Sequence, residues 1–290
     1  MNILKTPSNT AQSPMPRVSE SGSGARVAVG AAGLISSERG KTASVQDKYD
    51  NGDAAQKSTL AQHVNNGYQI SSEPIPPKWD NTIYDHDYDY NPNMKPTLKD
   101  GWNAVEWGAK GKAAGLIMPD AAAVYNHYRA NTGTDFTVNL AKGYKEDTAV
   151  KNSVDSEIRR TQESVENLRK QSGLDEFNVS GGLHPNSEYP TTENWQKTLG
   201  GFNTWSHAEV AYDKEKKEYQ MKITVNVLDR YNFNKGQKDI ASGTPDDVNG
   251  RFEALGWAKS FNAKGDMTFE VKWKEGEIAA STPAQVNQGR

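Results

Sequence analysis

The feature that most constrains the fold is a change of hydrophobic period near Phe177. Over residues 148–171 the apolar side chains recur mostly every three or four residues, as on an amphipathic helix, and Gly173 follows as a stop signal. Beyond Phe177 apolar and polar residues alternate, as they do in strands with one buried face. A single switch of this kind predicts an α+β fold, with helices packed on a mostly antiparallel sheet formed by residues 177–275.

Other elements follow from local signals. Pro119 and Asp120 precede good helix formers, so a helix is predicted over 121–129, and Asn131 to Gly133 should end it. Strands are predicted at 195–213, 218–228 and 266–273, with a charged hairpin tip at 214–217 and a short helix within 250–259. The predicted organisation is a disordered leader over 1–75, an aromatic-rich connecting segment over 76–118, an activity domain over 119–278 and a tail over 279–290.

Composition supports a leader outside the core. Only 34% of the 290 residues are hydrophobic, and no aromatic residue precedes Tyr49, so the first part of the chain lacks the apolar surface that offsets the entropy of ordering. Residues 1–18 carry no acid, and Glu20 is the first. This segment resembles the export leader of a type III secretion substrate or the flexible front of a bacteriocin, and an ordinary disordered tail is the alternative.

Charge and residue usage exclude several classes. The net charge of −3 argues against nucleic acid as a partner, and no apolar run approaches the ~20 residues of a transmembrane helix. No apolar segment follows the first basic residues, so a secretory signal peptide is not expected. The absence of cysteine excludes disulfides, thiol nucleophiles and cysteine-ligated metals.

Two segments concentrate acidic residues. Residues 84–91 alternate tyrosine with aspartate, but Tyr90 and Pro96 stand where a calcium-binding EF-hand needs Gly and Glu, so an aromatic-packed loop is favoured. The second segment is a strand-like run that ends in Asp229, Arg230 and Tyr231 and continues into a loop rich in Gly, Asp and Pro. A rigid strand that delivers an acid, an arginine and a tyrosine to one loop is a common way to build a polar site.

The C-terminal half resembles the colicin M family of bacteriocins over roughly residues 80–277. The matching stretches are a Tyr-Asp segment near residue 84, His127-Tyr128 with Gly133 and the following Val-Asn-Leu-Ala, Gly200 to Trp205, Asp-Arg-Tyr-Asn-Phe-Asn at 229–234, and Leu255-Gly256 with Ala258. Each motif is short, but their order and spacing together are moderately specific. The resemblance implies a curved sheet of the colicin M type.

The resemblance also implies an activity. Colicin M-type proteins are phosphoesterases that cleave lipid II between its polyprenyl chain and its pyrophosphate, in the periplasm and with a divalent cation. Asp229 and Tyr231 match catalytic residues of the family. Asn232 stands where the family has a second Asp, and no histidine follows His207 although the family carries a His-Arg pair there. Loss of a proton-transfer group typically lowers the rate of an enzyme ~10²–10⁴-fold.

The resulting site hypothesis assigns a role to each residue. The catalytic candidates are Asp229, Tyr231, Asn232 and Arg251; the substrate-binding candidates are Arg230 and Asn234; and the metal-binding candidates are Asp229, Asp246 and Asp247, for Mg²⁺ or Ca²⁺.

Each assignment has a structural alternative. The loop aspartates, including Asp239, could serve Asx turns, Arg251 a structural ion pair, and Tyr231 the core. His184 and His207 are outside candidates for proton transfer. Compared with the family's Asp, the amide of Asn232 can still form hydrogen bonds, but it carries no charge and cannot act as a base.

Two functions are therefore open. One is a secreted toxin that cleaves lipid II and blocks peptidoglycan synthesis in the periplasm of a target bacterium, with a possible immunity protein. The other is a non-enzymatic effector, delivered into a host cell with the aid of a possible secretion chaperone, that binds a partner or an anionic lipid through the same fold.

Overall fold

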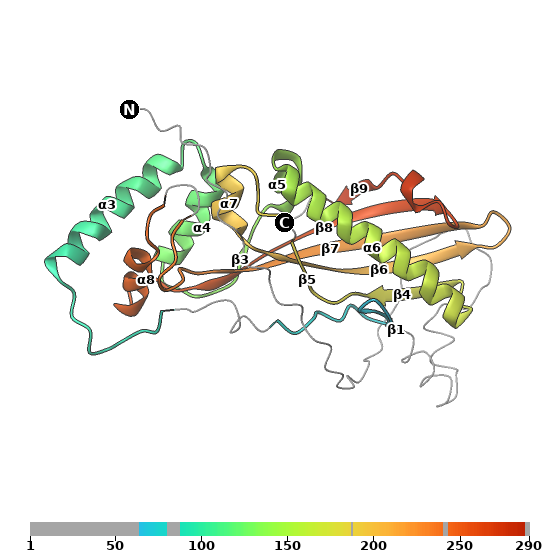
Figure 1. The fold of residues 1–290 in the computed structure, drawn as a ribbon, viewed down its shortest axis with the longest axis horizontal. Helices are drawn as coiled ribbons and strands as arrows, with labels where there is room; N and C mark the ends of the chain where they lie inside the picture. Colours follow the sequence, from blue (N-terminus) through green and yellow to red (C-terminus); the bar gives the residue numbers. More distant parts are fainter. Residues whose placement is uncertain (1–63, 80–87, 187, 240–242, 288–290) are drawn as a thin grey trace.

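A computed structural model of the chain describes residues 64–79, 88–186, 188–239 and 243–287. These residues form an α+β fold in which helices pack on a mixed, mostly antiparallel open sheet (Figure 1). The predicted fold class is confirmed at this level. The predicted disorder of the first 63 residues, the leader-like segment within them and Tyr84 to Asp87 lie outside the described residues.

The sheet has three long central strands. These are β6 (Asn203–Asp213), β7 (Glu218–Tyr231) and β8 (Phe261–Lys274), paired antiparallel in that order. On the β6 side lie β4 (Glu176–Ser180), β2 (Tyr68–Ile70) and β1 (Val64–Asn65), while β5 (His184–Pro185) pairs with the start of β6. On the β8 side, β3 (Phe136–Thr137) is parallel and β9 (Ala284–Asn287) antiparallel.

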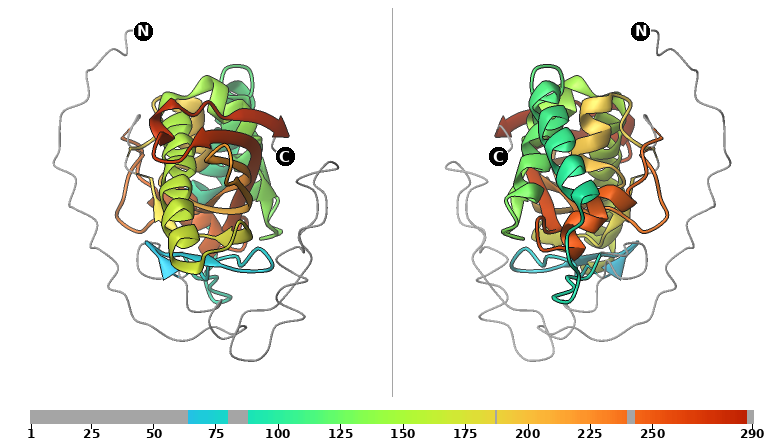
Figure 2. Two further views of the ribbon diagram at one scale, coloured as in Figure 1. Left: turned by 90° about the vertical axis from the view of Figure 1, so that its right-hand side faces the viewer. Right: turned by 90° about the vertical axis from the view of Figure 1, so that its left-hand side faces the viewer.

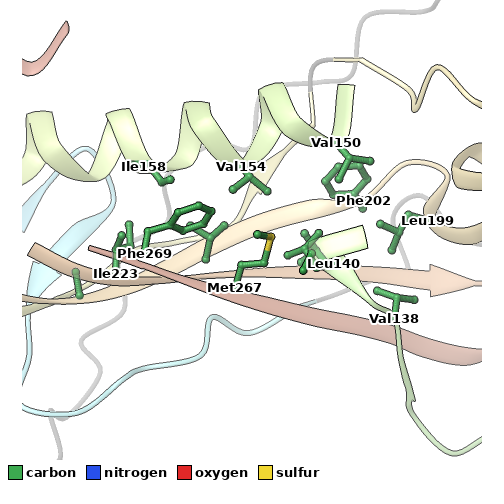
Figure 3. Packing of buried hydrophobic residues seen from close by; sticks show 14 of the residues in the cluster. Val138, Leu140, Val150, Val154, Ile158, Leu199, Phe202, Ile223, Met267 and Phe269 are labelled. Carbon is green, nitrogen blue, oxygen red and sulfur yellow. The ribbon is translucent and has the colours of Figure 1, made fainter. Parts of the chain in front are cut away.

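Helix α6 (Thr148–Ser172) covers one face of this sheet, as its period predicted. Its N-terminus is capped by the Asp147 side chain, and Gly173 ends it with φ of 71°, a left-handed conformation that glycine adopts at little cost. Figure 3 shows Val150, Val154 and Ile158 of α6 directed at the sheet, among side chains that include Phe202, Met267 and Phe269. Fully burying an aliphatic or aromatic side chain of this size contributes about 1.5–3 kcal/mol.

The other helices of the described residues lie mostly at one end of the sheet (Figure 1). They are α3 (Leu98–Ala114), α4 (Pro119–Arg129), α7 (Glu193–Leu199) and α8 (Asp247–Ala254), and α5 (Leu140–Glu146) leads into α6. A single 3₁₀ turn, η2 (Ile278–Ala280), precedes β9. Viewed along the long axis, α6 lies on one side of the sheet, with β1 and β2 (cyan) near one edge and β9 (red) near the other (Figure 2).

Most predicted elements are confirmed, and the departures have simple causes. The strand predicted from Trp195 begins only at Asn203, because Trp195 and Leu199 are four residues apart and both are buried on one face of α7. The helix predicted within 250–259 lies three residues earlier, in α8. The charged tip at 214–217 joins β6 to β7 as predicted.

The domain boundaries also move. Strands β1 and β2 fall inside the predicted leader, and Tyr68 and Ile70 are buried in the core, so the folded part begins no later than Val64. Helix α3 occupies much of the predicted connecting segment, and β9 lies in the predicted tail.

Candidate functional site

The site predicted at the end of β7 is split between the two faces of the sheet. Successive strand residues point to opposite faces. Asp229 and Tyr231 therefore share the helix-covered face with Val227, and Asp229 is buried. Arg230 lies on the opposite face, where its guanidinium donates a 3.1 Å hydrogen bond to Asn262 of β8.

An aromatic cluster surrounds Tyr231. Its ring stacks on Phe261 at 5.1 Å and meets the edge of Phe233 at 5.9 Å, and Tyr128 contacts both Tyr231 and Phe233 at 6.0 and 5.0 Å between ring centres. Tyr231 and Phe233 thus pack against the core, the structural role that the sequence left open. Burial raises the pKa of Tyr231, and the charges of nearby Asp229, Asp246 and Asp239 add to the rise. The phenol is therefore a hydrogen-bond donor and not a base.

The loop after β7 folds back toward this cluster. The backbone N–H groups of Asp239 and Asp246 donate to Thr244 and Gln237, and Lys238 and Pro245 form a β-bridge. As a result, a carboxylate oxygen of Asp246 accepts a 3.1 Å hydrogen bond from the backbone N–H of Asn234.

Asp246 has an unusual environment for a loop carboxyl. Burial raises its pKa, the N–H of Asn234 opposes that rise, and the charges of Asp239 and Asp247 reinforce it. A carboxyl that holds its proton to a higher pH than usual can act as an acid while a neighbouring carboxylate stays ionised.

The other loop acids are held by partners. Asp247 begins α8, and its carboxylate accepts hydrogen bonds from the Tyr88 hydroxyl and from the backbone N–H of Gly236, at 3.1 Å for the latter. The hydrogen bond from Tyr88, followed by that from Gly236, lowers the pKa of Asp247. Asp239 forms a 3.3 Å ion pair with Lys197 of α7.

The three predicted metal ligands do not form a joint site. Asp247 is directed to Tyr88 and Gly236, whereas Asp246 faces Asn234. In the described part of the chain, no group of three or more His, Asp or Glu side chains is arranged to hold a metal ion. Asp229 and Asp246 both act electrostatically on Tyr231.

Arg251 is also engaged, by Asp100 of α3. The guanidinium Nε and Nη2 atoms contact the two carboxylate oxygens, with Nη2 to Oδ2 at 2.8 Å. The hydrogen bond from Arg251 is the main reason that the pKa of Asp100 is lowered. The structural ion pair that the sequence left as an alternative is therefore present, and Arg251 is not directed into the loop.

The two asparagines of the motif contact each other. The Nδ2 atom of Asn232 donates to Oδ1 of Asn234 at 3.4 Å, and Asn234 also anchors Asp246 through its backbone. Asn234 thus shapes the loop from both its side chain and its N–H group.

On the opposite face, Arg230 lines a cavity of about 550 Å³. Its wall includes the side chains of Tyr88, Tyr90, Asn131, Glu253 and Lys259. Glu253 accepts two 2.7 Å hydrogen bonds from the N–H and hydroxyl of Ser260. The lining combines Arg230 and Lys259 with two acids, Asp89 and Glu253, and two tyrosines, so only the arginine and the lysine are groups that would hold an anionic ligand there.

Glu157, which no sequence pattern singled out, is the centre of a buried polar network. Glu157 is fully buried in α6. Its carboxylate accepts hydrogen bonds from the side chains of Tyr68 (2.7 Å), Ser206 (2.8 Å), Arg160 (2.9 Å), His184 (3.0 Å) and Thr204 (3.2 Å). The sequence signal for this network is weak. It is the spacing of Glu157 and Arg160, an acid and an arginine one helical turn apart.

Both histidines named as outside candidates lie away from the loop acids. His184 stacks on Tyr68, with 5.5 Å between ring centres, and its Nδ1 faces Glu157. His207 lies in β6 beside Trp205, on the face opposite α6, and burial lowers its pKa while the charge of Asp266 opposes that effect.

Comparisons of the chain with family models, with curated proteins and with solved structures found no match. Over the described residues, every helix is too short or too polar to cross a bilayer.

Proposed function

We propose that this chain is a secreted toxin with a divergent phosphoesterase site at the end of β7, which hydrolyses lipid II or a related polyprenyl pyrophosphate. The observation that carries the proposal is that Asp229 and Tyr231 share one face of β7 while Asp246 is held by the N–H of Asn234, three residues beyond Tyr231, because two carboxyls and a neutral phenol are the groups that phosphoester hydrolysis needs. The resemblance of residues 229–234 to the colicin M signature supplies the substrate class.

The groups divide into three roles. Asp229 takes a proton from the attacking water, and the phenol of Tyr231 donates a hydrogen bond to a phosphoryl oxygen. Asp246, whose pKa is raised, returns a proton to the oxygen that leaves with the polyprenyl chain. Water is thereby added across one phosphoester bond, which yields a polyprenol and a pyrophosphate product.

This assignment replaces the missing histidine of the family with a carboxyl. Mg²⁺ or Ca²⁺ would enter with the pyrophosphate as its counterion, and Asp229 and Asp246 are the carboxylates of this site that would hold it while it neutralises the phosphate charge.

The experiment is turnover of lipid II by the purified chain with Mg²⁺, followed by chromatography of the polyprenol product. Asp229→Asn should abolish product formation while the thermal unfolding transition stays in place. Glu218→Gln is the matched control, because it removes a carboxylate from the other end of the same strand. Wild-type turnover by a folded Asp229→Asn protein would remove this site from consideration.

The non-enzymatic alternative is favoured by one observation, the cavity lined by Arg230 and Lys259. In that case the chain is an effector that binds an anionic lipid or partner there, after delivery into a host cell. In that case the wild-type chain binds the intact polyprenyl pyrophosphate but does not turn it over. Arg230→Gln should lose this binding, and Asp229→Asn should keep it.

A further inference from the structure

Helix α3 carries its apolar residues on the wrong side for a core-packing helix. The residues that face α4 and α8 include a charged one and small ones: Asp100 and Gly111 are buried, and Ala104 and Trp107 are half-buried. A surface helix normally turns its apolar stripe inward and its polar residues outward. In α3 the longer apolar stripe faces outward and a carboxylate faces inward, although Ala104 and Trp107 also pack against the core.

The outward stripe runs the length of the helix. Leu98, Trp102, Val105 and Ala109 follow one another at intervals of four, three and four residues, and Leu116 comes seven residues later, just past the helix end. Residues at these spacings lie on one face of a helix.

The exposure of this stripe is large. Leu98 is 90% exposed, Trp102 75% and Val105 68%, and the stripe ends at Leu116 and Ile117, which are 88% and 77% exposed. Single exposed apolar residues are normal, but a contiguous set that includes a tryptophan marks an interaction surface.

This exposure is not a consequence of loose docking. The N-terminus of α3 is fixed by a capping box between Thr97 and Asp100, and Asp100 is held by Arg251 of α8. At Gly111 the helix approaches α4 so closely that a Cβ atom there would lie 3.3 Å from the ring of Tyr125. Because the inner face of α3 is fixed by these contacts with α4 and α8, the apolar stripe faces outward.

The charges around the stripe give the class of partner. Residues 95–112 contain four lysines, at 95, 99, 110 and 112, against two acids, although the whole chain has a net charge of −3. One of the two acids, Asp100, is turned inward to Arg251, and the other, Glu106, pairs with Lys110 at 2.8 Å. Exposed Leu, Trp and Val flanked by lysines is the composition of a helix that lies in the interface of an anionic bilayer.

We propose that α3 and the Leu116-Ile117 turn form an interfacial anchor that attaches the protein to an anionic lipid surface. The apolar stripe enters the headgroup region, and the lysines contact lipid phosphates. The anchor does not depend on catalysis. It would, however, hold the adjoining α8 and the end of β7 near the bilayer, where a lipid-linked substrate resides.

The test is co-sedimentation of the full chain with phosphatidylcholine vesicles that do or do not contain phosphatidylglycerol, and that contain no lipid II. We expect binding that requires phosphatidylglycerol and weakens with salt. The combined variant Leu98→Gln, Trp102→Gln, Val105→Gln should bind at least about tenfold more weakly. The matched control is Val286→Gln, which makes the same kind of change at an exposed apolar residue of β9.

A second variant tests the charge contribution. Lys99→Gln with Lys112→Gln should weaken binding to the anionic vesicles, whereas Lys272→Gln, an exposed lysine of β8, should not. All substituted side chains are exposed, so each variant should unfold at the wild-type temperature.

Several results would overturn the proposal. The first is no vesicle binding by wild type, and the second is equal binding by the stripe variant and wild type. The third is a stable wild-type dimer that becomes a monomer in the stripe variant, because the stripe would then be the contact with a second copy of the chain. Failure here is distinct from failure of the proposed enzyme, because Asp229→Asn should bind vesicles normally and the stripe variant should still cleave detergent-dispersed substrate.

Discussion

Replacing the buried carboxylate of Glu157 by an amide should destabilise the fold and remove one component of its pH dependence. Burial alone would raise the pKa of Glu157, but the hydrogen bond and charge of His184, with the hydrogen bonds from Arg160 and Tyr68, outweigh burial and lower it from 4.5 to about 2. At about 1.4 kcal/mol per pH unit, that difference corresponds to about 3 kcal/mol in favour of the folded state.

The sign of the pH effect follows from the direction of the pKa. A carboxyl with a lowered folded-state pKa contributes its full stabilisation above its unfolded pKa of about 4.3, and this is lost as the pH falls through the folded value of about 2. In Glu157→Gln the amide offers its NH₂ group to side chains that are themselves donors, so the loss should be present at pH 7.

The assay is urea unfolding of wild type and Glu157→Gln at neutral pH and at several acidic pH values. We expect the variant to be less stable by about 3 kcal/mol at neutral pH, with the difference shrinking between about pH 5 and pH 2. Glu163→Gln, on the exposed face of the same helix, is the control and should match wild type. Equal stability of Glu157→Gln and wild type at neutral pH, or a difference that does not change with pH, would refute the reasoning.

Three further predictions concern ion pairing and packing. Arg251→Ala should lower stability by about 2–3 kcal/mol in thermal or urea unfolding, because it leaves the buried Asp100 carboxylate without its bidentate partner; a loss of activity without a loss of stability would contradict this. Asp247→Ala, which changes an exposed acid, should cost less than Arg251→Ala in the same measurement. Gly265→Ala should cost about 1–3 kcal/mol, since the new Cβ would lie 2.9 Å from the backbone oxygen of Val138, and an unchanged unfolding midpoint would show that the strands can separate there.

Some parts of the molecule were fixed by local pattern. The period of residues 148–171 and the glycine after them predicted α6 almost to the residue, and the alternation beyond Phe177 predicted the long strands. These succeed because one face of each element is buried, so the period of burial is written directly into the sequence.

Helix α3 could not be predicted in the same way. Its stabilising contacts are Asp100 with Arg251, which lie 151 residues apart, and the close approach at Gly111. Its apolar stripe faces solvent, so the sequence signal that normally marks a buried face is misleading there.

The candidate site shows the same division. The sequence alone determined which residues lie at the end of β7. The alternation of side chains along a strand placed Asp229 and Tyr231 on one face of the sheet and Arg230 on the other. Only the tertiary structure decided that Asp246 folds back to Asn234, that Arg251 pairs with Asp100, and that Glu157 gathers four side chains from other segments. Those outcomes depend on contacts between residues distant in the chain, and no local propensity or spacing encodes which distant partner will satisfy a buried charge.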